Sequence, residues 1–122
     1  MIGKNNNKTR LSSFKAAHQG LIHALIHQKN FQSQAIIGII AVFLALVLGF
    51  SRFEWLILII TIALVLTAEL LNTVIEVVVD LAVKEKLIPD AGLAKDVSAA
   101  AVLLMSFFAA IVGLILFIPH LF

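Results

Sequence analysis

Three long apolar runs, separated by short polar stretches, constrain the fold of this chain more than any other feature of its sequence. The runs cover residues 32–50, 53–81 and 97–118, and a helix of about 20 residues already crosses the hydrocarbon core of a bilayer. They make the chain 61% hydrophobic and only 13% charged, whereas roughly a quarter of the residues in a soluble domain are charged. The sequence therefore predicts an all-α membrane protein in which residues 1–122 form one domain with three transmembrane helices.

The segment before the first run has a different pattern and predicts a helix that lies at the membrane interface. Within residues 10–30, apolar side chains recur at offsets of three, four and seven, which mark one face of a helix: Leu11, Phe14, Leu21, Ile22, Leu25 and Ile26. Cationic and polar residues stand between them, as in interfacial helices, although an ordinary surface helix packed against the bundle would show the same pattern. Residues 1–9 are polar and low in complexity, so we expect them to be flexible.

The positions of the basic residues predict how the chain is oriented in the bilayer. Five of them precede the first apolar run and three lie between the second and third runs: Lys4, Lys8, Arg10, Lys15 and Lys29, then Lys84, Lys86 and Lys95. The positive-inside rule places the N-terminus and this loop in the cytoplasm, and it puts the C-terminus outside. The net charge of +2 does not indicate a nucleic-acid partner, and the absence of cysteine excludes thiol chemistry and disulfides.

Chemistry is concentrated on one side of the second predicted transmembrane helix. Three carboxylates and an amide lie within about 80° of one another on the helical wheel, with a threonine beside them: Glu69, Glu76, Asp80, Asn72 and Thr73. An ionisable group at the bilayer centre costs at least about 2–3 kcal/mol, so this polar stripe must face protein, water or a cation. A hydrogen-bonding seam between helices would use the asparagine, but three like charges favour a site for a divalent cation and phosphate.

Phosphoryl transfer also requires contacts to phosphate, and the sequence has no glycine-rich nucleotide loop. The lysine-rich loop after the second run is the remaining candidate, because Lys95 and Asp96 end it and Glu85 stands near its start. A lysine at the phosphates and an acid near the metal would complete a minimal kinase site. Spacing alone leaves a second interpretation of Lys95 open, in which it anchors the third helix at the membrane surface.

These two segments carry a resemblance to a known family. The stretch AELLNTVIEVVVDL, followed by GLAKDVSAAAVLL, is similar to the prokaryotic diacylglycerol kinase family, which includes the undecaprenol kinases and has the pattern E-x-x-N-[ST]-x-x-E-x-x-x-D followed by A-K-D. The resemblance implies a homotrimer in the bacterial cytoplasmic (inner) membrane, with active sites formed between subunits. It also implies an enzyme that phosphorylates a lipid alcohol of the bilayer, diacylglycerol or undecaprenol, with ATP as co-substrate and Mg²⁺ as cofactor.

The resemblance further implies roles for individual residues. Glu69 matches the catalytic base, and Glu76 matches the residue that binds the metal bridging the ATP phosphates. The positions implied in the ATP site are Asn72, Glu76, Glu85, Lys95, Asp96 and Arg10. Thr73 and Asp80 would support these residues from beside them.

One position departs from the family pattern and leaves alternatives open. The family usually carries a second metal-binding glutamate at the end of the amphipathic helix, where this chain has Gln28, and Gln32 replaces a basic residue. An amide oxygen can ligate magnesium without adding negative charge, so the chain is either an active lipid kinase or a catalytically weakened member. The competing class is a non-enzymatic pore or assembly factor, in which the polar stripe would line a cation path. Lys95 and Asp96 favour the kinase, because a pore needs only the stripe.

Overall fold

The computed structural model describes residues 9–84 and 89–122, and these ranges form four helices and contain no strand. The helices are α1 (Arg10–His27), α2 (Lys29–Leu48), α3 (Arg52–Val83) and α4 (Pro89–Leu121). The predicted all-α class is therefore confirmed. Of the segment expected to be flexible, residues 1–8 lie outside the described ranges, whereas Thr9 caps α1 by accepting a hydrogen bond from the backbone N–H of Ser12 at 3.1 Å.

Three of these helices, α2, α3 and α4, are long and apolar enough to cross a membrane. Between 11% and 22% of their most apolar windows is buried within the chain, so most of the apolar side chains point away from the chain's own helices. Hydrocarbon or further protein must cover such a surface, because soluble monomers rarely expose apolar patches of this extent to water. The structure thus agrees with the prediction of three transmembrane helices.

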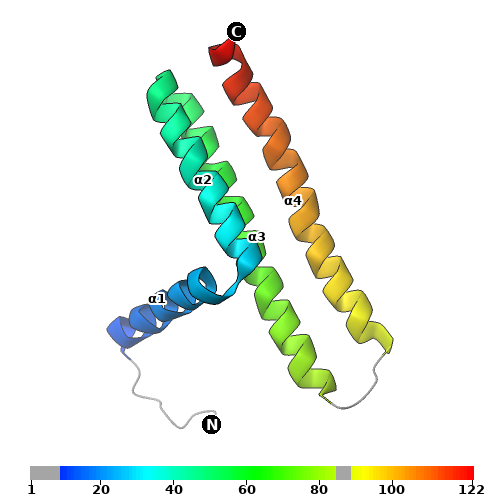
Figure 1. Cartoon of the computed structure of the whole chain (residues 1–122). Coiled ribbons are helices and arrows are strands. Elements are labelled where there is room, and N and C mark those ends of the chain that lie inside the picture. Colours follow the sequence, from blue (N-terminus) through cyan, green and yellow to red (C-terminus); the bar gives the residue numbers. More distant parts are fainter. Residues whose placement is uncertain (1–8, 85–88) are drawn as a thin grey trace.

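The central helix of the bundle is α3, since it packs against both α2 and α4. α2 and α3 run side by side in opposite directions, and α4 returns alongside α3 to bring the C-terminus to the end where α2 and α3 are connected (Figure 1). α1 packs on α2 and projects sideways from the bundle (Figure 1). Its direction, across the transmembrane helices rather than along them, suits the predicted location at the membrane interface.

The break between α1 and α2 comes earlier than predicted, because Gln28 adopts an extended conformation (φ −104°, ψ 108°). The surface helix therefore ends at His27 rather than at residue 30, and α2 begins directly after Gln28. The side-chain amide of Gln32 donates hydrogen bonds to the carbonyl oxygens of Leu25 and Ile26, each at 2.9 Å. It thus satisfies carbonyl groups that the last turn of α1 leaves without an intrahelical partner.

The bounds of the long helices differ from those of the apolar runs that predicted them. α2 begins three residues before its predicted run and ends at Leu48, before residue 50, because Gly49 ends the helix in a left-handed conformation. α4 begins at Pro89 rather than at residue 97, because proline is well tolerated at the first helical position and the polar residues after it continue the helix. Pro119 lies inside the last turn of α4, which continues to Leu121. α3 exceeds its predicted run by one residue at its start and two at its end. Hydropathy marks only the apolar part of a helix, so it does not detect the polar residues in the first turns of α3 and α4, such as Arg52 and Asp90.

The connection between α2 and α3 is short and well capped. Gly49 has a left-handed backbone (φ 74°), a conformation that costs glycine less than other residues. Ser51 and Glu54 form a capping box, in which the side chain of each accepts a hydrogen bond from the backbone N–H of the other, at 3.3 and 2.8 Å. Phe50, between Gly49 and Ser51, belongs to a buried apolar cluster whose other members are Ala45, Leu58 and Leu116.

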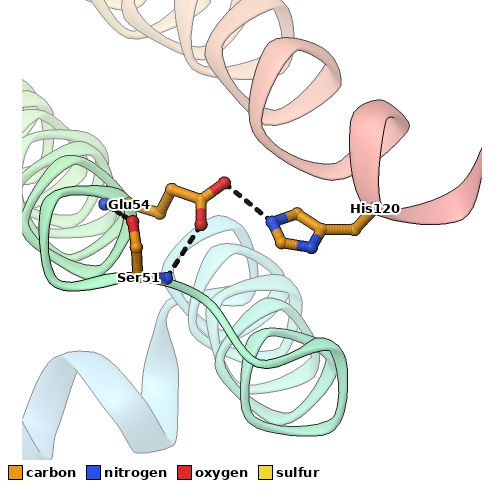
Figure 2. Close-up of polar contacts among 3 residues, drawn as sticks. All are labelled: Ser51, Glu54 and His120. Carbon is orange, nitrogen blue, oxygen red and sulfur yellow. Dashed lines mark hydrogen bonds and ion pairs between the residues drawn. The ribbon is translucent and has the colours of Figure 1, made fainter.

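The same carboxylate joins the start of α3 to the end of α4. Figure 2 shows Glu54 between Ser51 and His120, and its Oε2 lies 2.7 Å from Nε2 of His120. The His120 ring also stacks on Phe50, with 4.9 Å between the ring centroids. All three long helices are thus held together at the end of the bundle that carries the α2–α3 turn.

We expect the Ser51→Ala variant to be about 1 kcal/mol less stable than the wild type, because loss of a helix N-cap typically costs this much. The capping hydroxyl is lost while the pair between Glu54 and His120 remains. Thermal denaturation in detergent, followed by far-UV circular dichroism, measures the change. Ser13→Ala is the matched control, since Ser13 is an exposed residue of α1, and equal midpoints for the two variants would contradict the assigned cap.

Candidate functional site

The polar stripe of α3 passes from a buried part to an exposed part of the helix. Glu69 and Asn72 are 5% and 7% exposed and are the buried polar side chains of the described residues. Thr73 and Glu76 are half-buried, and Asp80 near the end of α3 is exposed. The hydroxyl of Thr73 donates to the backbone carbonyl of Glu69 at 3.2 Å and so stays on its own helix. The first two members of the stripe thus face protein, one of the surroundings that the sequence allowed.

A pocket of about 320 Å³ lies beside the buried carboxylate and amide. Its walls come from three helices: Asn30, Ser33 and Gln34 of α2, Glu69 and Asn72 of α3, and Ala99, Val102, Leu103 and Ser106 of α4. Residues three apart on a helix share a face, which is why Glu69 and Asn72 line the same wall. A small polar group that enters this polar pocket reaches both of them.

The side chain of Asn72 uses only part of its hydrogen-bonding capacity. Its Nδ2 donates to Oε2 of Glu76 over 3.5 Å, whereas its Oδ1 is buried without a hydrogen-bond partner among the described residues. A buried acceptor left unpaired costs about 1–3 kcal/mol, so this oxygen requires a donor or a cation. Carboxylate and amide oxygens are the ligands that hard cations such as Mg²⁺ take. Asn72 and Glu76 therefore fit the donor chemistry of a magnesium site.

Lys95 of α4 reaches across to the exposed end of the stripe. Its Nζ lies 2.9 Å from Oδ1 of Asp80, and the two side chains are 39% and 64% exposed. An ion pair this exposed contributes little to stability, but it holds an ammonium group beside the stripe. The contact places Lys95 beside the stripe, and both its role in the site and the alternative of a membrane anchor stay predictions.

Several predicted residues are not joined to this site in the described part of the chain. Arg10 is exposed at the start of α1, and Asp96 is exposed on α4. Gln28 is half-buried at the break between α1 and α2, and Glu85 lies outside the described residues. Within residues 9–84 and 89–122, no three His, Asp or Glu side chains are grouped so that they could hold a metal. The role of Gln28 as a metal ligand beside Glu76 stays a prediction.

Four polar residues of the polar pocket were not predicted from the sequence: Asn30, Ser33, Gln34 and Ser106. The first three precede or begin the apolar run of α2, and their spacing of three and four was a signal that could have found them. Ser106 is a lone hydroxyl within the apolar run of α4, where its Oγ accepts a hydrogen bond from Nε2 of Gln34 at 3.3 Å. That contact depends on how α2 and α4 approach each other, which no local pattern reveals.

Comparison with known proteins gives two relatives and one family. Residues 15–117 match the family described as Prokaryotic diacylglycerol kinase. The chain is 39% identical over 111 residues to a protein of Synechocystis sp. named diacylglycerol kinase. The aligned residues make up 91% of this chain and 63% of the relative. It is 35% identical over 109 residues to a Bacillus subtilis protein named undecaprenol kinase. The aligned residues make up 89% of this chain and 88% of that relative. The chain thus spans less than two thirds of the first relative and most of the second.

Replacing the buried amide tests whether the site reduces the stability of the bundle. We expect Asn72→Leu to unfold at the same temperature as the wild type or above it, because the variant removes a buried acceptor that has no partner. The matched variant Val65→Asn puts the same amide at a buried apolar position of α3 and should lose about 1–3 kcal/mol. Thermal unfolding in detergent compares the two. A loss in Asn72→Leu as large as that in Val65→Asn would show that Asn72 is fully satisfied.

Proposed function

Because this chain belongs to the prokaryotic diacylglycerol kinase family, we propose that it transfers the γ-phosphate of ATP to the hydroxyl of a membrane lipid alcohol. The observation that carries the proposal is the burial of Glu69 at the wall of a pocket between transmembrane helices. A carboxylate in this place can meet the hydroxyl of a molecule that stays in the bilayer. The names of the two relatives support diacylglycerol and undecaprenol as the substrates to test.

In the proposed reaction Glu69 is the catalytic base. It takes the proton of the lipid hydroxyl as the hydroxyl oxygen forms a bond to the γ-phosphorus. The bond between that phosphorus and the oxygen bridging to the β-phosphorus breaks, ADP leaves, and the proton passes from Glu69 to solvent. A positioned general base accelerates such a step by about 10²–10⁴-fold.

The more exposed part of the stripe is proposed to bind the nucleotide. Glu76 and Oδ1 of Asn72 would hold Mg²⁺, which when bound supplies positive charge beside the phosphates. Lys95 would contact a phosphate oxygen, and Asp80 positions its ammonium group through the contact at 2.9 Å. The remaining contacts to ATP are proposed, from the family pattern, for Arg10, Glu85 and Asp96.

We further propose that the chain forms a homotrimer in the bacterial cytoplasmic membrane, with its N-terminus in the cytoplasm and its C-terminus outside. The two groups of basic residues support this orientation. One observation supports the assembly of several copies: most of the apolar surface of α2, α3 and α4 is not covered by the chain itself.

The Glu69→Gln variant tests the proposed base. We expect its kcat to fall at least about 10²-fold, because the amide keeps the shape of the side chain but cannot accept the proton. Glu54→Gln is the matched control, since it makes the same change near the start of α3, away from the polar pocket, and should keep its activity. Detergent-solubilised protein with labelled ATP, magnesium and each lipid alcohol in turn reports the turnover. Wild-type turnover in Glu69→Gln would exclude this residue as the base.

A second variant addresses the departure at Gln28. If this side chain lies at the metal, Gln28→Glu restores a negative ligand and should lower the magnesium concentration for half-maximal activity, because Mg²⁺ prefers carboxylates among protein ligands. The KM for the lipid should stay the same, since the hydroxyl is addressed by Glu69. Gln19→Glu adds the same charge at an exposed position of α1 and should not move the magnesium midpoint. A midpoint that does not move in Gln28→Glu removes Gln28 from the site.

A further inference from the structure

A second pocket lies between the transmembrane helices, closer to the α2–α3 turn than the polar pocket. It has a volume of about 380 Å³ and is lined by residues of α2, α3 and α4. Small residues form much of its wall: Gly38 and Ala41 of α2, and Ala109, Ala110 and Gly113 of α4. A Cβ atom added at Gly113 would meet nothing within 4 Å. This apolar pocket is therefore open beside Gly113, in a part of the bundle that lies within the apolar runs.

The two pockets adjoin each other, because Gln34 and Ser106 line both of them. The hydrogen bond from Gln34 to Ser106 connects α2 and α4 at this boundary. Along each of the three helices, the residues of the apolar pocket lie on the side of the α2–α3 turn, and those of the polar pocket lie on the opposite side. A single molecule that spans this boundary would place a polar group beside Glu69 and an apolar chain between the helices.

We propose that the apolar pocket receives the hydrocarbon chain of the lipid alcohol, and that Gly113 limits how bulky this chain can be. The proposal rests on the lipid kinase function proposed above and assigns part of its substrate specificity to one position of α4. The hydroxyl end of the lipid lies at Glu69, at the wall of the polar pocket. The hydroxyl end and the chain join at the boundary between the two pockets.

The position of the apolar pocket favours a hydrocarbon chain over a helix from a second copy of this protein, because the pocket adjoins the polar pocket that Glu69 lines. A hydrocarbon chain is much narrower than a helix. The hydrogen bond between α2 and α4 also limits the separation of these helices, because neither can move away without losing it.

The Gly113→Leu variant tests the proposal by filling the pocket with a side chain. Wild type and variant are assayed with two lipids that share a reacting group and differ in chain length. The pairs are 1,2-dioleoylglycerol with 1,2-dihexanoylglycerol and undecaprenol with farnesol, and the pair that the wild type phosphorylates is used. The ratio of kcat/KM for the long lipid to that for the short lipid should fall at least about tenfold in Gly113→Leu, because apolar pockets discriminate by bulk in this range.

Two further variants keep the test decisive. Gly113→Ala adds only a Cβ atom in open space and should lower the ratio by a smaller factor. If Gly113→Leu does not fold, the ratio measured for Gly113→Ala tests the proposal in its place. Ala101→Leu is the matched control, because Ala101 is an exposed residue of α4 outside both pockets, and should leave the ratio unchanged.

Two outcomes would overturn the proposal. The first is an unchanged ratio in an active Gly113→Leu protein. The second is an equal loss with both lipids together with a changed oligomeric mass, which would assign the apolar pocket to a second copy of the chain. A wild-type protein that phosphorylates none of the four lipids would instead contradict the proposed function, so the two failures are distinguishable.

Discussion

A carboxylate that lies among transmembrane helices has to be covered by protein or water, and the arrangement of this bundle follows from that requirement. Glu69 and Asn72 are buried on the face of α3 that lies toward α2 and α4. α3 is accordingly the central helix, and its two neighbours provide the other walls of the polar pocket. Burial also leaves Oδ1 of Asn72 without a partner. The packing that accommodates the polar groups therefore leaves one of them available to a ligand.

The two ends of the bundle differ in how well their polar groups are satisfied. At the α2–α3 turn, Glu54 accepts a hydrogen bond from the backbone of Ser51 and contacts His120, whose ring stacks on Phe50. At the other end, the contact between α3 and α4 is an exposed ion pair that contributes little to stability. Local stability varies within a protein, and elements that bind ligands are often among the less stable ones. The polar contacts that join the helices thus lie at one end of the bundle, and the candidate site extends from the middle of α3 toward the other.

Hydropathy and helical periodicity are local properties, and what depends on them could be predicted from the sequence. The all-α class, the three apolar helices and the family resemblance are confirmed. The burial of Glu69 against protein is one of the surroundings that the sequence allowed. The end of α1 was placed too late, because the break at Gln28 is accompanied by a contact from the side chain of Gln32 to the preceding helix. The hydrogen bond between Gln34 and Ser106 joins residues 72 positions apart, so no local pattern could predict that boundary of the pocket.

The unequal lengths of the helices determine where the stripe lies relative to the membrane. α2 has 20 residues and α3 has 32, which correspond to about 30 Å and about 48 Å, and the hydrocarbon core is about 30 Å thick. Because the helices are joined at the end of Glu54 and His120, the extra length of α3 projects at the opposite end. Glu69 lies about 26 Å along α3 and Asp80 about 42 Å along it. The boundary between the hydrocarbon core and water therefore crosses the stripe itself. A lipid-soluble alcohol and a water-soluble phosphate donor can meet there while each stays in its own phase.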